Sequence, residues 1–264
     1  MTDTSRPHGL ANRSSNYGDR DFALYLRRSF AKSMGYSQAM LEKPVVGIAD
    51  TGSDYNNCHR TAPELVEAVK RGVLAAGGLP LAFPTVSLCE PSLNPCSMHY
   101  RNLMALDTEA MLTAQPMDAA VLVGGCDKTV PAQLMAAVSS GTPSVMLVTG
   151  PMLAQAFEGE RLSACTDCRR YWARYRAGEV DAGRIAQIEG KLATTAGTCG
   201  VMGTASTMAC ASIGPVTSMT EGVPELTAAM SCAGTVLSQP PTSTAASIGC
   251  AVNIASVSSA IRLR

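Results

Sequence analysis

From residue 19 onward, apolar and polar residues follow patterns that are typical of alternating helices and strands. Apolar residues recur at helical spacing over residues 19–34, which predicts a first helix. The run PVVGIAD (44–50) is β-branched and mostly apolar, which predicts a buried strand. Residues 61–78 predict a second helix, because Thr61 can cap its N-terminus and two glycines end it. A helix, a strand and a helix therefore open the pattern.

The alternation of strands and helices continues to residue 148. The further expected elements are strands at 80–88, 119–123 and 143–148 and helices at 98–114 and 130–139. Such alternation predicts an α/β fold, a mainly parallel sheet flanked by helices. Ligands of these sheets bind beyond the carboxyl ends of the strands. The loops DTGSDYNNCH, CEPSLNP and GGCDKT follow three of the strands, so their polar residues are expected at one edge.

The last part of the chain has a different composition. Residues 211–264 contain only four charged residues but fifteen Ser or Thr, and no helical or strand period persists there. We therefore divide the chain into a domain at 1–210 and an atypical Ala/Ser/Thr-rich tail at 211–264. The tail is either a connection within a larger fold or sequence produced out of frame or at a truncated end.

Charge and hydropathy narrow the classes of partner. The 21 basic and 21 acidic residues balance, and no basic cluster interleaves with aromatic residues, which argues against nucleic acid and anionic membranes. We therefore expect a small-molecule partner. The polar N-terminus lacks the apolar core of a signal peptide, and no apolar run reaches bilayer length. These features predict a cytoplasmic protein.

The ten cysteines favour thiol or metal chemistry over disulfides, because the cytosol keeps ordinary thiols reduced. Five of them are interpreted as small buried hydrophobic residues: Cys89, Cys96, Cys210, Cys232 and Cys250. Cys165 and Cys168 form a CxxC motif that, taken alone, is typical of a redox pair or half of a zinc site. No second CxxC accompanies it.

The segment GGCDK (124–128) combines three reactive side chains. Cys126 follows a strand and precedes a helix, where unpaired N–H groups and the helix dipole favour a thiolate. A structural cysteine in a turn is the alternative. Asp127 offers hard oxygens suited to Mg²⁺. Lys128 is either a surface ion-pair partner or an amine that is modified or used chemically.

In chain order, the four blocks RNLMALD, GGCDKTVPAQLMAA, GPML and GTCGVMGTASTMAC resemble blocks of the dihydroxy-acid and sugar-acid dehydratase family, which includes 6-phosphogluconate dehydratase. The resemblance runs from about residue 20 to residue 210, roughly the N-terminal half of a typical member. It implies the family's N-terminal α/β domain, with the C-terminal β-barrel domain absent from this chain. It also implies that full-length relatives are homo-oligomers.

The resemblance further implies an iron–sulfur cluster, 2Fe-2S rather than 4Fe-4S, with Mg²⁺ beside it. The cluster ligands that it implies are Cys58, Cys126 and Cys199. The metal ligands that it implies are Glu90, Asp127 and Lys128, the lysine as a carbamate. Soft thiolates suit iron and hard oxygens suit magnesium, so neighbouring residues can hold two different metals. His59 either hydrogen-bonds near the cluster or packs within its own loop.

The implied activity is that of a hydro-lyase that converts a 2,3-dihydroxy acid, an aldonate or a branched acid, into a 2-keto-3-deoxy acid. Loss of the C2 proton and of the C3 hydroxide both need a Lewis acid, which Mg²⁺ and an open iron can supply. In the family the base is a serine of the C-terminal half, which has no matching motif here, so the catalytic residue is unknown. We therefore expect little or no activity from this chain. The alternative is a non-catalytic iron–sulfur or metal-binding remnant.

Overall fold

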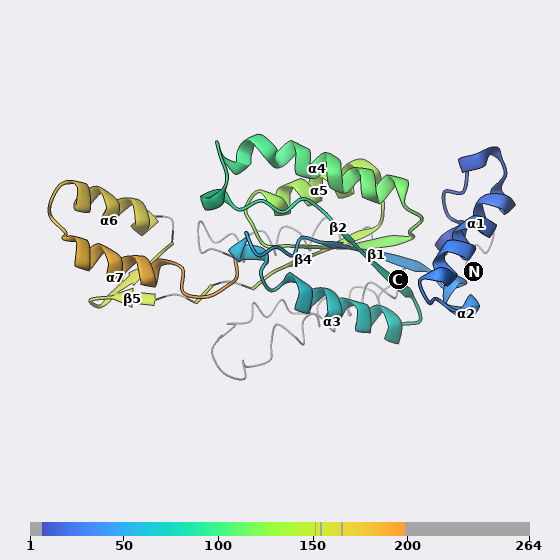
Figure 1. Ribbon diagram of the computed structural model, residues 1–264, viewed down its shortest axis with the longest axis horizontal. Helices are drawn as coiled ribbons and strands as arrows, with labels where there is room; N and C mark the ends of the chain where they lie inside the picture. Colours follow the sequence, from blue (N-terminus) through green and yellow to red (C-terminus); the bar gives the residue numbers. More distant parts are fainter. Residues whose placement is uncertain (1–6, 151, 154, 165, 199–264) are drawn as a thin grey trace, which may run out of the picture.

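The computed structural model describes residues 7–150, 152–153, 155–164 and 166–198. Its centre is a four-stranded sheet in the order β2-β1-β3-β4, in which every neighbouring pair is parallel (Figure 1). The strands are β1 (Val45–Asp50), β2 (Leu79–Pro84), β3 (Ala119–Gly124) and β4 (Ser144–Val148). The parallel α/β fold expected from the sequence is confirmed.

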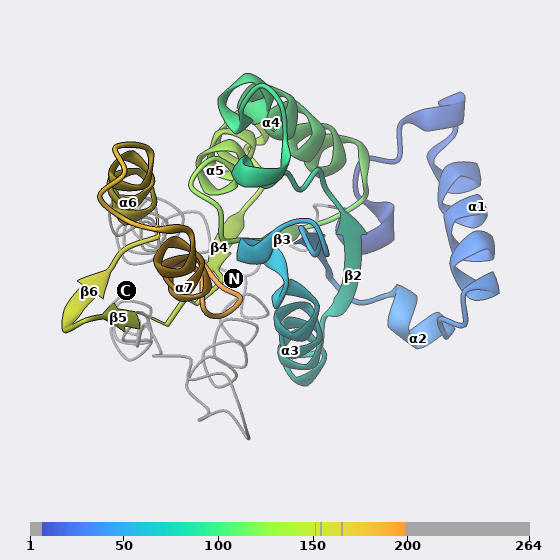
Figure 2. The ribbon, with the colours of Figure 1, turned by 60° about the vertical axis from the view of Figure 1, so that its left-hand side comes forward.

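Helices cover both faces of this sheet, as Figure 2 shows. One face packs against α3 (Ala62–Ala75), and the other against α4 (Ser97–Ala114) and α5 (Thr129–Ser140). Successive residues of a strand point to opposite faces, so Val46 and Ile48 join the α3 cluster while Val45 and Ala49 join the other. Both faces are therefore apolar, which explains the continuous hydrophobic run of β1.

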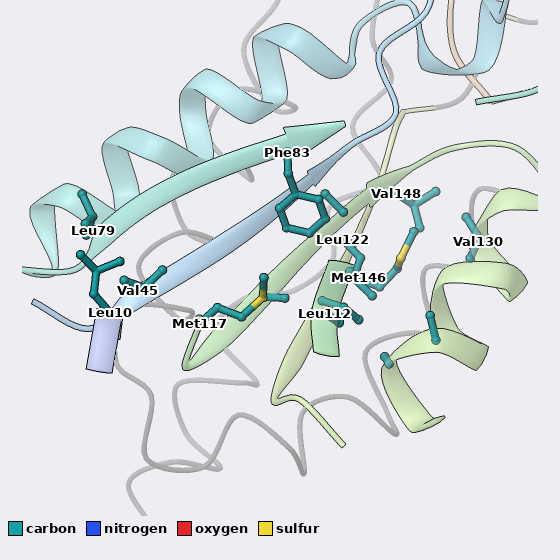
Figure 3. Close-up of a cluster of buried hydrophobic side chains, with 14 of the residues drawn as sticks. Leu10, Val45, Leu79, Phe83, Leu112, Met117, Leu122, Val130, Met146 and Val148 are labelled. Carbon is teal, nitrogen blue, oxygen red and sulfur yellow. The ribbon is translucent and has the colours of Figure 1, made fainter. Parts of the chain in front are cut away.

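The larger of the two clusters lies under α4 and α5, and Figure 3 shows its side chains. Phe83 of β2, Leu122 of β3 and Met146 of β4 meet Leu112 of α4 and Val130 of α5 there. All five are less than a tenth exposed. Burying a side chain of this size contributes about 1.5–3 kcal/mol, so this layer holds the helices on the sheet.

The N-terminal segment is anchored at the amino ends of the strands. It contains the short 3-10 helices η1 (Gly9–Ala11) and η2 (Asn16–Gly18), then α1 (Arg20–Ser33) and α2 (Gln38–Leu41). The Asp118 carboxylate accepts hydrogen bonds from the N–H groups of Gly9, at 2.7 Å, and Val45, at 2.8 Å. One acidic side chain thus joins this segment to both β1 and β3.

A separate small unit lies at the end of the molecule opposite α1 (Figure 1). It comprises the hairpin strands β5 (Gln155–Phe157) and β6 (Glu160–Leu162) and the helices α6 (Thr166–Arg176) and α7 (Ala182–Leu192). Its own core consists of Phe157, Leu162, Tyr171 and Ile188. The sequence predicted none of these four elements.

Two of the five cysteines interpreted as buried are half-buried instead. Cys89 directly precedes the short 3-10 helix η4 (Glu90–Ser92), and Cys96 directly precedes α4. Both lie in the loop between β2 and α4. That loop leaves the sheet, so its thiols are not enclosed by the core. The boundary at 210, the tail, Cys165, Cys199, Cys210, Cys232 and Cys250 lie outside the described residues. No helix of the described part combines the length and apolarity needed to cross a membrane.

Candidate functional site

Three loops at the carboxyl ends of β1, β2 and β3 carry five of the six predicted ligands. Cys58 lies in the 3-10 helix η3 (Asn57–His59) after β1, and Glu90 begins η4 after β2. Cys126, Asp127 and Lys128 connect β3 to α5. The structure therefore brings the loops to the single edge that the sequence predicted. The sixth residue, Cys199, lies outside the described residues.

The Cys58 and Cys126 side chains come from different loops and meet in the interior. They are 7% and 4% exposed. A hydrogen bond from Cys58 lowers the pKa of the Cys126 thiol below its ordinary value, and a backbone hydrogen bond from Lys128 acts in the same direction, against burial and the charge of Asp127. Two adjoining buried thiols, one of them favouring the thiolate, suit the binding of a soft metal better than a purely structural role.

Gly125 allows the two loops to approach so closely. A Cβ atom on Gly125 would lie 1.7 Å from Oγ1 of Thr149 and 2.6 Å from the carbonyl oxygen of Cys58. No side chain fits in that space, because carbon and oxygen atoms without a bond stay more than about 3 Å apart. The glycine before Cys126 is thus a packing requirement of the site.

His59 is buried between these loops, with 0% of its surface exposed. Its Nε2 accepts a hydrogen bond from the backbone N–H of Cys126 at 3.1 Å, and its Nδ1 lies 2.7 Å from Oγ of Ser87. Burial lowers the pKa of His59 to about 4, so the ring is neutral at neutral pH. The ring therefore hydrogen-bonds to the Cys126 loop and also packs against Asn56 of its own loop, so each of the two sequence interpretations describes part of its surroundings.

Glu90, Asp127 and Lys128 form a charged group next to the thiols. The Lys128 ammonium pairs with the Asp127 carboxylate, and Cys126 Sγ lies 3.5 Å from Asp127 Oδ1. Partial burial acts to lower the pKa of Lys128, but the hydrogen bond and charge of Asp127, with the charges of Cys126 and Glu90, raise it above its ordinary value. Glu90 also accepts a hydrogen bond from the N–H of Ser97 at 2.8 Å, at the start of α4.

Neither the three predicted cluster ligands nor the three predicted magnesium ligands form a complete metal site within the described residues. There, no three or more His, Cys, Asp or Glu side chains form a group that could hold a metal ion. The thiol pair lacks the third predicted cysteine, and the two carboxylates have a lysine as their third member.

Sequence reasoning missed two threonines that join the Cys58 loop to the segment before Cys199. Thr149 Oγ1 donates to the Cys58 carbonyl at 2.7 Å and lies 3.0 Å from Thr198 Oγ1. The N–H of Thr198 donates to the carbonyl of Gly150 at 2.8 Å, and the N–H of Gly197 donates to that of Asn57 at 3.0 Å. The sequence signal that could have found them is their position: Thr149 directly precedes the block GPML, and Thr198 lies within the block GTCGVMGTASTMAC.

The described cysteine of the CxxC motif lies away from the candidate site. Cys168 is a half-buried residue of α6, in the small unit, and Cys165 is outside the described residues. Between them, Asp167 accepts a hydrogen bond from the N–H of Ser163 and pairs with Arg170. Asp167, between the two cysteines, therefore has a structural role at the start of α6.

Comparison with known proteins covers the sheet, its helices and the candidate site. A family model described as "Dihydroxy-acid/6-phosphogluconate dehydratase N-terminal" matches residues 43–214. The chain is 41% identical over 171 residues to 6-deoxy-6-sulfo-D-gluconate dehydratase of Pseudomonas putida, covering 65% of the chain and 30% of that protein. It is 39% identical over 184 residues to L-arabinonate dehydratase of Rhizobium leguminosarum bv. trifolii (69% and 32%). It is 36% identical over 189 residues to dihydroxy-acid dehydratase of Clostridium beijerinckii (70% and 34%). The chain spans about a third of the length of these relatives.

Proposed function

Because the chain belongs to the dihydroxy-acid/6-phosphogluconate dehydratase family, we propose that its described domain is the cluster- and metal-binding part of a hydro-lyase. The reaction is the dehydration of a 2,3-dihydroxy acid to a 2-keto-3-deoxy acid. The observation that carries this proposal is the meeting of the Cys58 and Cys126 thiols beside Glu90, Asp127 and Lys128 at one sheet edge.

The donor set fits an iron–sulfur cluster. Cys58 and Cys126 are adjoining sulfur donors, and thiolates are the usual ligands of such clusters. The proposed third ligand is Cys199, the residue that follows Thr198 in the chain. Support comes from the hydrogen bonds that join Thr198 and Gly197 to the Cys58 loop and to the end of β4.

The neighbouring side chains fit a hard cation. Glu90 and Asp127 supply carboxylate oxygens, and carbamylation of Lys128 would add two more while removing the positive charge from the site. The Lys128 side chain is 26% exposed, so carbon dioxide can reach its amine. When bound, the two metals would supply the Lewis acidity that proton loss at C2 and hydroxide loss at C3 require.

The substrate class is proposed from the relatives. Their names specify a sulfo-sugar acid, a pentonic acid and a dihydroxy acid, all substrates of dehydratases. We favour a sugar acid. The base is proposed to lie in a part of the family's architecture beyond the matched residues 43–214, so the 264-residue chain is expected to bind metal with little turnover.

Anaerobic reconstitution of the 264-residue chain with iron and sulfide tests the cluster. The parent chain is expected to turn brown and to retain iron, and Cys126→Ser is expected to lose both. Cys168→Ser is the matched control, because its thiol lies in the separate unit, and it should behave as the parent does. A colourless parent chain, or equal iron in Cys126→Ser, would contradict the cluster.

Keto-acid formation tests the catalytic proposal separately. The reconstituted chain is assayed with a panel of aldonates and a branched dihydroxy acid, beside a full-length relative. Little turnover is expected from the chain. Turnover equal to that of the relative would show that the base lies within residues 1–264. Cluster assembly without turnover in any extended version would favour the metal-binding remnant.

A further inference from the structure

One buried ring contacts all three loops that carry the proposed ligands. His59 follows Cys58 in the first loop, bonds the backbone of Cys126 in the second, and lies against Ser87, three residues before Glu90, in the third. We propose that His59 is a positioning residue that holds the Cys58 and Cys126 sulfur atoms at the spacing and orientation that metal binding needs. This inference rests on the proposed function of the two thiols.

The hydrogen bonds define which ring nitrogen carries the proton. A backbone N–H can only donate, so the 3.1 Å contact from Cys126 requires Nε2 to be an acceptor. The proton of the neutral ring is then on Nδ1, from which it is donated to Ser87 Oγ at 2.7 Å. The ring is therefore a neutral bridge that accepts from one ligand loop and donates to another.

Asn56 extends this bridge to Cys58 itself. Its Oδ1 accepts from the N–H of Cys58 at 3.0 Å, and its Nδ2 donates to the carbonyl of Leu88 at 3.1 Å. The 2.9 Å approach of Nδ2 to Nδ1 of His59 is a packing contact and not a hydrogen bond, because both nitrogens carry hydrogen in this tautomer. Asn56 and His59 are both 0% exposed. Because no water reaches these groups, a lost partner within the set leaves a buried donor or acceptor unsatisfied.

The role of the ring is distinct from holding the loops together. Gly125 already packs against the Cys58 carbonyl without the histidine. Thr149 also connects the two loops, because its hydroxyl donates to the Cys58 carbonyl and its N–H donates to the Gly124 carbonyl at 3.0 Å. Removing the ring releases the N–H of Cys126, so the direction of its side chain changes while the adjacency of the loops remains. Loss of such an outer partner typically weakens metal binding by roughly 10- to 100-fold.

Cadmium binding to the metal-free 264-residue chain tests this role without depending on cluster assembly. Binding is followed by the ultraviolet charge-transfer absorbance of cadmium thiolates, with circular dichroism to monitor the fold. His59→Ala is expected to bind cadmium roughly 10- to 100-fold more weakly than the parent. His59→Gln should recover most of the affinity, because its side-chain oxygen can accept from the N–H of Cys126. His99→Ala, an exposed histidine of α4, is the matched control and should bind as the parent does.

Two results would overturn the inference. One is folded His59→Ala that binds cadmium as tightly as the parent, and the other is parent binding that Cys126→Ser does not weaken. Nitrogen NMR of histidine-labelled parent chain gives a second readout should His59→Ala fail to fold. The His59 ring should carry its proton on Nδ1, and a proton on Nε2 would refute the bridge. If iron and sulfide fail to assemble while cadmium and NMR behave as expected, the proposed function fails and the positioning role stands.

Discussion

Replacing Gly125 with alanine tests the closest packing contact of the site. The new Cβ would lie 1.7 Å from Thr149 Oγ1, 2.6 Å from the Cys58 carbonyl oxygen and 3.0 Å from Thr149 Cβ. The hydroxyl must leave its place, and with it the 2.7 Å hydrogen bond to Cys58 is lost. The carbonyl cannot move far, because it belongs to the backbone of the buried η3 segment.

The size of the effect follows from two contributions. Leaving a buried acceptor without its hydrogen bond costs about 1–3 kcal/mol of stability. Overpacking a closely packed interior costs about 1–3 kcal/mol more. The free energy of unfolding should therefore fall by about 2–6 kcal/mol. Because domains are typically stable by about 5–15 kcal/mol, a decrease near the upper value would bring the chain close to unfolding.

Urea unfolding followed by circular dichroism measures this change. Gly190→Ala is the matched control, because Gly190 lies on the exposed side of α7 and a Cβ there meets nothing within 4 Å. Alanine in an open helix position should raise the free energy of unfolding by up to about 1 kcal/mol. In a Thr149→Ala background, Gly125→Ala should cost less than in the parent, since the nearest clashing atom is gone. A Gly125→Ala variant within about 0.5 kcal/mol of the parent would refute the packing argument.

Three further predictions concern stability. Asp118→Ala removes the acceptor of two backbone N–H groups, so urea unfolding should show a loss of about 2–4 kcal/mol; an unchanged midpoint would contradict the anchor. The pKa of His59 is lowered from 6.5 to about 4 in the folded chain, so as the pH falls the unfolded chain binds a proton at this residue before the folded chain does. Stability of the metal-free chain should therefore be full above pH 6.5 and fall as the pH drops toward 4, by up to roughly 3 kcal/mol, and an equal fall in His59→Gln would refute this. Gly141→Ala should cost about 1–2 kcal/mol in thermal or urea unfolding, because Gly141 ends α5 with a φ of +63°; a neutral result would contradict it.

The sheet was predictable because its strands are buried on both faces. Their apolar runs stand out from the amphipathic helices, so the expected bounds of β1, β3 and β4 are within one residue of the observed ones. The second strand was expected to reach residue 88 but ends at Pro84. Beyond it, the N–H of Val86 bonds the side chain of Asp107 in α4 at 2.8 Å. A partner 21 residues away leaves no trace in the local pattern.

The sequence predicted that the candidate ligands lie at one edge of the sheet, but it did not predict which side chains contact one another there. The rule that parallel strands present their carboxyl ends together was enough to group Cys58, Glu90 and Cys126. The meeting of the two thiols and the contact of His59 with Cys126 depend on packing between loops more than 60 residues apart, as the 67-residue separation of the latter pair shows. The small unit was missed because its strands are three residues long and α6 is mainly polar and basic.

The hydrogen bond from Thr198 to Gly150 makes the small unit an excursion that leaves and re-enters the fold at one point. Closing a longer loop costs little additional chain entropy, about 0.6 kcal/mol for each doubling of its length. Insertions, deletions or exchange of the unit would therefore be absorbed within the excursion, while the register of the chain beyond the closure point stays the same. Such a junction allows the sequence and length of the unit to change at little cost to the geometry of the ligand loops beside it.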